Sequence, residues 1–295
     1  MTAEFLVQAI VPVTVIIMMT TVGLNLRLDA VRENFRRPRS LLICTLLQIV
    51  LLPLVVLILI AVLAPPPLFA IAMFGVAISP GGTLSNIYTH LAGGNLALSV
   101  MMTIITTLLV SVTALVVAGV AVATGMLGFD GAGQLSPVAI ASDVLRVSLL
   151  PICLGILCAW RLPVLAARIR PAFDALCVVS LVTAVVCSAI VSWPVAQQAA
   201  AATLGYAAAL VFVSLLLGTV VSAALPPDDR SACVIEFGVR NLPIALLLSS
   251  SVAASPEVVA FLLFCLIVSA SALLTFTALR RSFVRRRVAW GVRHR

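Results

Sequence analysis

The sequence has no lysine, only two histidines and few charged residues of either sign. Charged residues make up 9% of the 295 residues and hydrophobic residues 63%, whereas a soluble domain carries about 25% charged residues. Because such a chain cannot cover itself with a polar surface, a water-soluble fold is excluded. The two histidines, His90 and His294, lie far apart and form no metal-ligand spacing with the cysteines. A metal site built from His and Cys ligands, and an enzyme that depends on one, are therefore not predicted.

The net charge of +8 comes from arginine alone. A positive charge of this size can indicate nucleic-acid binding, but these arginines lie mostly between apolar runs and at the C-terminal end, where basic residues orient a membrane protein. No nucleic-acid partner is therefore predicted. No disulfide framework is predicted either, because the seven cysteines lie within apolar runs, where a thiol behaves as a small hydrophobic group. They are Cys44, Cys153, Cys158, Cys177, Cys187, Cys233 and Cys265.

Long apolar runs dominate the chain. About twenty apolar residues suffice for a helix to cross a bilayer, and runs without alternating polar residues favour helices over the strands of a membrane barrel. The runs predict an all-α integral membrane protein with nine transmembrane helices. The predicted spans are residues 7–26, 40–63, 68–91, 95–123, 136–159, 172–193, 200–224, 229–253 and 256–279.

The arginines outside these runs predict the orientation of the chain. If nine spans alternate across a membrane, all of these arginines fall on one side. The loops on the other side contain no basic residue; they are 64–67, 124–135, 194–199 and 254–255. By the positive-inside rule, the N-terminus is expected outside and the C-terminus, with a basic tail at 280–295, in the cytoplasm. A bacterial inner membrane is the expected location. Two arginines lie inside predicted spans, and of these Arg146 is expected to pair with Asp143.

Two of the predicted spans are interrupted near the middle. The third contains SPGGTLSN at 79–86 and the eighth contains EFGVRNLP at 236–243. Proline and paired glycines do not continue a regular helix. In lipid, the freed backbone groups are tolerated only where they line a protein-enclosed cavity. Both segments therefore predict discontinuous helices around a polar site.

The order of the spans places these two interruptions in opposite directions across the membrane. Residues 1–123 then form a first repeat, 124–171 a connecting span and 172–279 a second, inverted repeat, all within a single transporter domain of residues 1–295. Corresponding broken helices in two inverted halves indicate the binding site of a secondary transporter.

The residues at the breaks predict the chemistry of this site. Unwound carbonyls and helix carboxyl ends suit a cation, while exposed amides at helix amino ends suit an anion. Glu236 is the only carboxylate well inside a span, and its charge needs a cation, a proton or Arg240 as its partner. Ser99, Thr103 and Thr106 share one face of the fourth span. Gln48 is either a ligand or a link between helices.

These motifs resemble those of the bile acid:sodium symporter family over almost the whole chain. The second break matches at Glu236, Gly238 and Asn241, and an earlier helix matches at Gln48 and Pro53. The first break carries the most specific match, at Pro80, Gly81, Gly82, Thr83, Ser85, Asn86, Thr89, Leu91, Ala92, Gly94, Asn95, Ala97, Leu98 and Ser99.

The resemblance implies sodium-coupled uptake of a small organic anion by alternating access, with no resident cofactor and no enzymatic activity. It implies one sodium site at Ser85, Asn86, Ser99, Thr103 and Glu236. It also implies a second site at Gln48, Glu236 and the backbone oxygens of Phe237 and Val239. The substrate is then expected near Thr83 and Asn241.

Arg240 departs from the resemblance, because many sodium-coupled members have glutamine before the asparagine. One hypothesis is that this positive charge replaces the second sodium, which leaves one sodium or a proton as the coupling ion. A rival hypothesis is that Arg240 grips the substrate carboxylate with two hydrogen bonds.

Other functions are less consistent with the residues. The chain offers no catalytic Ser–His arrangement for a membrane enzyme, and inverted broken helices with a buried carboxylate fit a carrier better than a channel. A proton-coupled or uncoupled anion carrier, and a related efflux carrier in which the cysteines take part, both remain alternatives. Bile acids, pantoate, pyruvate and other small carboxylates are not separated by the sequence.

Overall fold

The computed structural model describes residues 2, 5–26, 38–123, 142, 145–250 and 255–293. Helices and the short segments between them account for this part of the chain, which contains no strand. Five of its helices are long and apolar enough to cross a membrane, or six if one pair bent by 62° is counted as a single span, and two shorter helices are also apolar. The prediction of an all-helical membrane protein agrees with this structure.

Three short π-helical turns each precede a proline near the start of an α-helix. The turns are η1 (Leu6–Ile10), η2 (Leu47–Leu51) and η4 (Leu145–Leu149). They lead into α2 (Val11–Leu24), α5 (Leu52–Leu63) and α10 (Leu150–Arg161), in which proline occupies the second position. Proline lacks an N–H and crowds the carbonyl one turn earlier, and the local π turn accommodates both effects.

The remaining helices follow the apolar runs. The two interrupted spans give α6 (Pro67–Ile78) with α7 (Thr83–Leu91) and α12 (Pro227–Gly238) with α13 (Leu242–Ser250). The others are α4 (Pro38–Leu46), α8 (Leu96–Ala123), α11 (Pro163–Ser222) and α14 (Pro256–Arg293).

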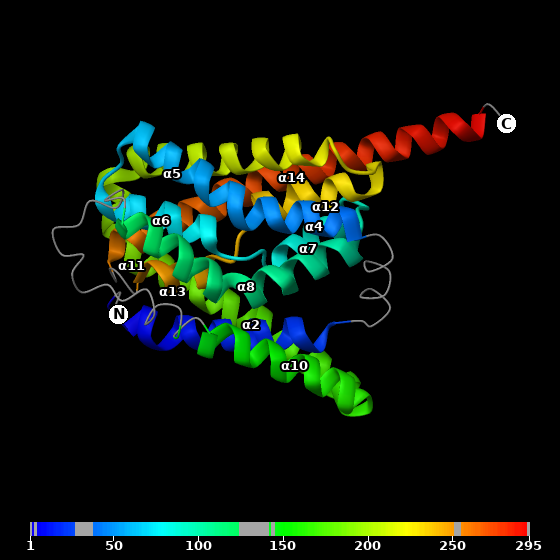
Figure 1. Cartoon of the computed structure of the whole chain (residues 1–295), viewed down its shortest axis with the longest axis horizontal. Helices are drawn as coiled ribbons and strands as arrows, with labels where there is room; N and C mark the ends of the chain where they lie inside the picture. Colours follow the sequence, from blue (N-terminus) through cyan, green and yellow to red (C-terminus); the bar gives the residue numbers. More distant parts are fainter. Residues whose placement is uncertain are drawn as a thin grey trace.

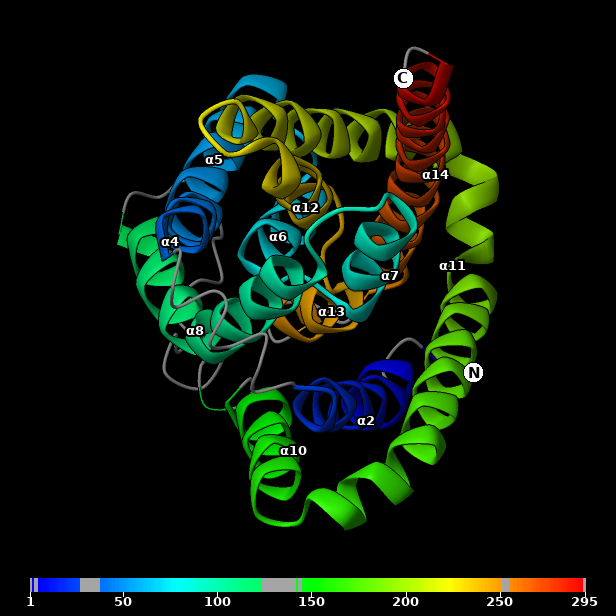
Figure 2. The same cartoon turned by 90° about the vertical axis from the view of Figure 1, so that its right-hand side faces the viewer.

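The helices form two groups (Figures 1 and 2). In the first, the α2 bundle, α2 packs on α10 and on the first part of α11, residues 163–195. The second, the main bundle, contains α4 to α8, α12 to α14 and the last part of α11, residues 200–222, with α12 and α6 near its centre (Figure 2). Figure 2 shows α11 curving around the molecule from one group to the other.

One predicted loop is a helix in the structure. Residues 194–199 lie at the junction of two candidate spans, Pro163–Val195 and Ala200–Ser222, as expected, but they are helical, because α11 continues through them with Pro171 and Pro194 inside it. The residues after Pro194 are mostly alanines and glutamines, which favour helix, and these outweigh the single proline. The predicted loop 124–135 and the beginning of the predicted span 136–159 lie outside the described residues.

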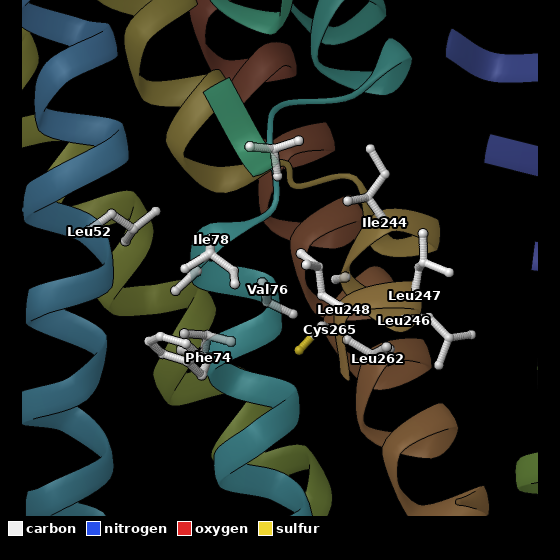
Figure 3. Packing of buried hydrophobic residues seen from close by; sticks show 14 of the residues in the cluster. Leu52, Phe74, Val76, Ile78, Ile244, Leu246, Leu247, Leu248, Leu262 and Cys265 are labelled. Atoms are coloured by element: carbon white, nitrogen blue, oxygen red, sulfur yellow. The ribbon is translucent and has the colours of Figure 1, made fainter. Parts of the chain in front are cut away.

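The main bundle is centred on α6. Every residue from Phe69 to Ile78 is buried, and Figure 3 shows Phe74, Val76 and Ile78 of α6 between α5 on one side and α13 and α14 on the other. Phe69 stacks on Phe261 of α14, with ring centroids 5.7 Å apart. A helix that is apolar on all sides is enclosed by protein, so the break that follows Ile78 lies in the interior.

Several helix ends lie at the end of the molecule from which α14 extends (Figure 1). Arg170 Nη2 donates to Leu24 O, the last carbonyl of α2, at 2.8 Å, and Arg281 Nε donates to Leu91 O, the last of α7. Asp229 near the start of α12 accepts from Ser40 Oγ at 2.6 Å and from Asn95 Nδ2 at 2.8 Å. Arg170 and Arg281 thus both lie at this end of the molecule.

Candidate functional site

The first break turns the chain sharply between α6 and α7. Ser79 has extended backbone dihedrals (φ −66°, ψ 148°), and so does Gly82 (φ −129°, ψ 173°). The two half-helices meet at 62°. No side chain caps the amino end of α7, so its first amides at Thr83 and Leu84 remain as an anion-attracting end within the protein.

The second break lies against the first. Val239 is extended (φ −109°, ψ 118°), and Asn241 N donates to Pro80 O at 2.9 Å, which joins the two breaks through their backbones. Asn241 Oδ1 accepts from Ile244 N at 3.2 Å and so caps the amino end of α13. A Cβ on Gly82 would lie only 3.6 Å from Asn241 Cα. Two segments separated by about 160 positions of the printed sequence thus cross at one point.

The carboxylate of Glu236 is fully buried beside this crossing. Its Oε1 lies 2.6 Å from Ser85 Oγ, 2.6 Å from Ser99 Oγ and 3.1 Å from Thr103 Oγ1, and all three hydroxyls can donate to it. Its Oε2 has no hydrogen-bond partner. Gly81 lies directly against Oε2, since a Cβ at this position would overlap it.

Oxygen atoms outnumber protons around Glu236. Ser85 Oγ has one proton but lies 2.6 Å from both Oε1 and Gly82 O. Ser99 Oγ likewise has one proton for Oε1 and for Asn86 Oδ1, which lies 2.8 Å away. Thr89 Oγ1 reaches only Ser99 Oγ, at 3.3 Å. A buried carboxylate in such a cluster lacks positive charge, and oxygens arranged in this way are hard ligands of the kind that bind an alkali cation.

Gln48 approaches Glu236 from the opposite side. This residue is fully buried in the π turn η2, and its Nε2 donates to the backbone Glu236 O at 2.9 Å, while its Oε1 has no partner. The structure thus brings five of the predicted cation ligands, Ser85, Asn86, Ser99, Thr103 and Glu236, into one cluster. Gln48 touches the backbone of this cluster and not its carboxylate.

Arg240 points away from Glu236. Its Nε donates to Val76 O at 3.3 Å, and its Nη2 donates to Ala77 O at 2.9 Å and to Ser79 O. Its Nη1 has no partner. Within the described part of the chain, Glu236 and Arg240 bind separate partners, and no direct ion pair joins them. With two of its three nitrogens engaged at α6, the guanidinium cannot grip a carboxylate with two hydrogen bonds in this conformation.

A cavity separates the crossing from the α2 bundle. Its empty space measures about 660 Å³, a figure that includes the solvent at its open mouth. Thr83, Arg240 and Asn241 lie at its polar end, and each has a buried polar atom without a hydrogen-bond partner: Thr83 Oγ1, Arg240 Nη1 and Asn241 Nδ2. Its other walls are almost entirely apolar and come from α2, α11, α13 and α14, through residues such as Met18, Leu181, Leu246, Val259 and Leu262.

Several features of this site could not be read from the sequence. The walls from α2 and α11 carry no polar signal, because apolar residues there look the same as those that face lipid. In the sequence, Gly81 is explained by its tendency to break a helix, so nothing there indicates its contact with Glu236. Asp143 lies outside the described residues, so its predicted pairing with Arg146 stays a prediction.

Among the described residues, no three His, Cys, Asp or Glu side chains are grouped to hold a metal ion, and the seven cysteines are free thiols.

Comparisons with known proteins identify relatives of this chain. The protein of Bacillus subtilis named "Uncharacterized sodium-dependent transporter YocS" is 30% identical over 240 residues, which are 80% of this chain and 72% of that protein. The Arabidopsis thaliana protein named "Probable sodium/metabolite cotransporter BASS1, chloroplastic" is 30% identical over 243 residues, 79% of this chain and 57% of that protein. A "Sodium-dependent organic anion transporter" of Bos taurus is 34% identical over 92 residues, 31% of this chain and 24% of that protein. This chain thus spans a little over half the length of its plant relative.

The profile of one protein family matches residues 12–198, more than half of the chain. This family is described as the Sodium Bile acid symporter family. The match covers the first break with Ser85 and Ser99 and ends before the second, which carries Glu236. Since members of the family are transporters, the apolar helices and the buried polar crossing are those of an integral membrane transport protein, and the chain belongs to the sodium bile acid symporter family.

Proposed function

We propose that this protein couples the entry of sodium to the transport of a small organic anion by alternating access. The observation that carries the proposal is the cluster around Glu236, in which a buried carboxylate is surrounded by more oxygens than protons and keeps Oε2 without a partner. An intramembrane carboxylate needs a counter-charge, and Na⁺ supplies it without a proton donor. Relatives named sodium-dependent transporters support this choice of ion.

The ligands of the sodium ion are Ser85, Asn86, Ser99, Thr103 and Glu236 in this proposal. They come from three segments, α7, α8 and α12, and the ion draws these segments together. Gln48 contributes from η2 by holding the backbone of Glu236 at 2.9 Å. Its free Oε1 is one further oxygen close to the cluster.

The anion binds at the polar end of the cavity. Asn241 Nδ2 and Arg240 Nη1 are donors without partners there, Thr83 lies beside them, and the uncapped amino end of α7 adds its partial positive charge. The remaining walls are apolar, with Ser188 as an exception. This arrangement favours a substrate with one anionic group and an apolar body.

Coupling follows from the position of the two sites in this proposal. The ion binds on one side of the crossed breaks and the anion on the other, and the Asn241–Pro80 hydrogen bond joins these breaks. An ion that fixes Glu236 and Ser85 therefore also fixes the first turns of α7 and α13, which hold the anion. The cavity lies between the two bundles, so movement of the α2 bundle against the main bundle exposes it to either side.

The membrane arrangement is part of the proposal. It comprises nine spans in two inverted repeats, residues 1–123 and 172–279, joined by residues 124–171 and followed by a basic tail at 280–295. The position of Arg170 and Arg281 at the end from which α14 extends supports a cytoplasmic position for that end. The N-terminus is then outside, and the membrane is a bacterial inner membrane.

The test is uptake into proteoliposomes of a panel of radiolabelled small carboxylates, under an imposed gradient of sodium or of protons. We expect saturable uptake of at least one anion that requires inward sodium, and its loss in Glu236→Gln. This variant keeps the shape of the side chain but lacks the charge that binds a cation. Uptake that follows the proton gradient alone would show that the coupling ion at Glu236 is a proton and not sodium. Uptake that needs neither gradient contradicts symport. Efflux against a sodium gradient would instead identify an efflux carrier.

A further inference from the structure

The carboxyl end of α6 lies inside the protein. The last turn of a helix leaves carbonyl groups without helical partners, and this end of the helix carries a negative partial charge of about half an elementary charge. The residues from Phe69 to Gly82 are all buried, so this end is remote from bulk water. A buried helix end of this kind calls for a cation or for hydrogen-bond donors.

Arg240 supplies both a positive charge and hydrogen-bond donors at the carboxyl end of α6. Its guanidinium donates to the carbonyls of Val76, Ala77 and Ser79 through Nε and Nη2, and only 9% of the residue is exposed. The charge comes from the opposite break, between α12 and α13, and is fixed in place by the covalent chain. Because a guanidinium stays protonated in proteins, this charge is present throughout a transport cycle.

We infer that Arg240 is a built-in cation that takes the place of a mobile cation at the carboxyl end of α6, so that one sodium ion, bound at Glu236, drives each cycle. The inference rests on the proposed sodium coupling and specifies its stoichiometry. Unwound helix ends at such crossings otherwise attract mobile cations. Here one of the two helix carboxyl ends at the crossing is already neutralised by the protein itself.

The balance of charges has a consequence for transport. The fixed charges of Glu236 and Arg240 cancel each other, so a single sodium ion balances a singly charged anion in the loaded carrier. A second sodium ion would add an uncompensated buried charge near a guanidinium, which is costly in a medium of low dielectric constant. Uptake of a monovalent anion is therefore electroneutral and independent of the membrane potential.

The first measurement is the number of ²²Na⁺ ions bound by the purified chain in a scintillation proximity assay, for the wild type and three variants. We expect a single ion in the wild type and in Arg240→Lys, which keeps the charge, and a second ion in Arg240→Gln, which removes it. The matched control is Arg170→Gln, because Arg170 also donates to a carbonyl at a helix carboxyl end, that of Leu24, but lies away from the crossing. This control should still bind a single ion.

The second measurement is the effect of an imposed potassium diffusion potential on uptake of a singly charged anion. Wild-type uptake should not respond, whereas uptake by Arg240→Gln should rise when the interior is negative. Two ions bound by the wild type, or uptake by the wild type that depends on the potential, would overturn the inference even if Arg240→Gln does not fold. Two ions in the wild type would leave the proposed symport intact. A wild type that binds no sodium would contradict the proposed sodium coupling as well.

Discussion

Gly81 lies against the carboxylate of Glu236, in the break between α6 and α7. A Cβ built on Gly81 would overlap Oε2 and would lie 3.1 Å from Cδ of Glu236 and 3.3 Å from Thr103 Oγ1. Gly81 does not have a positive φ, so the reason for a glycine at this position is the close contact with Glu236 and not a left-handed backbone. The glycine makes room for the carboxylate and for what it binds.

Gly81→Ala is therefore expected to weaken sodium binding. A Cβ forced into a filled interior costs roughly 1–3 kcal/mol, which corresponds to an increase of about 5- to 150-fold in the sodium concentration for half-maximal uptake if the whole cost falls on the ion-bound state. The measurement is sodium-dependent uptake together with ²²Na⁺ binding.

The control for this prediction is a double-mutant cycle with Glu236→Asp. A shorter carboxylate leaves space for the new methyl group, so the added cost of Gly81→Ala should be smaller in the Glu236→Asp background than in the wild type. Additive effects of the two substitutions would show that the alanine acts elsewhere.

Thr103 and Thr107 provide a matched pair on α8. Thr103 Oγ1 reaches Glu236 Oε1 at 3.1 Å, whereas Thr107 Oγ1 donates only to the backbone Thr103 O, at 2.7 Å. Both side chains are fully buried. We expect Thr103→Val to raise the sodium concentration for half-maximal uptake by roughly tenfold, because it removes one oxygen from the proposed sodium ligands, and a polar contact to a charged group contributes about 1.5–3 kcal/mol. Thr107→Val should leave it unchanged, and equal effects of both variants would argue against a specific role for Thr103.

Asn241 combines two roles that substitution can separate. Its Oδ1 caps α13 through Ile244 N, and its Nδ2 is a buried donor without a partner at the cavity. Asn241→Asp keeps a capping oxygen but replaces the donor by a negative charge, so the KM for the anion should rise by about tenfold or more while thermal stability is retained. Asn241→Ala loses the cap as well, and its stability should fall by about 1 kcal/mol. A normal KM in Asn241→Asp would remove Asn241 from the substrate site.

Gly23 and Gly155 set the contact between α2 and α10. A Cβ on Gly23 would lie 2.8 Å from Ile156 N and 2.9 Å from Gly155 Cα, both of which are backbone atoms that cannot move aside independently. Small residues at such positions let membrane helices approach closely. Gly23→Ala should therefore reduce stability by about 1–3 kcal/mol, measured by thermal unfolding in detergent. Gly205→Ala is the control, because a Cβ on this helical glycine meets nothing within 4 Å and should leave the unfolding temperature the same or higher.

The sequence predicted the main elements of the site because their signals are local. Pro80, Gly81 and Pro243 mark the two breaks, and the spacing of Ser99 and Thr103 places both on one helical face toward Glu236. The structure brings these residues together, while the binding of an ion to them stays a prediction.

Other features depend on the tertiary structure. The partners of Arg240 are carbonyls more than 160 positions away, and main-chain acceptors of this kind leave no pattern of side chains to read. The helix through residues 194–199 was not predicted, because a proline usually ends a helix, and here the alanines and glutamines after Pro194 outweigh it. Backbone groups in the interior of a membrane protein must be paired. Which group pairs with which depends on the tertiary fold and not on the neighbouring sequence.

The continuity of α11 has a dynamic consequence. This helix joins the α2 bundle to the main bundle, and Pro194 within it has no N–H to donate to the carbonyl of Ile190. A helix bends most easily where such a bond is missing, so we expect the two bundles to rock about this point. Because the pivot touches neither the ion cluster nor the cavity, a change at Pro194 should alter the turnover number while the dissociation constants for sodium and anion stay constant.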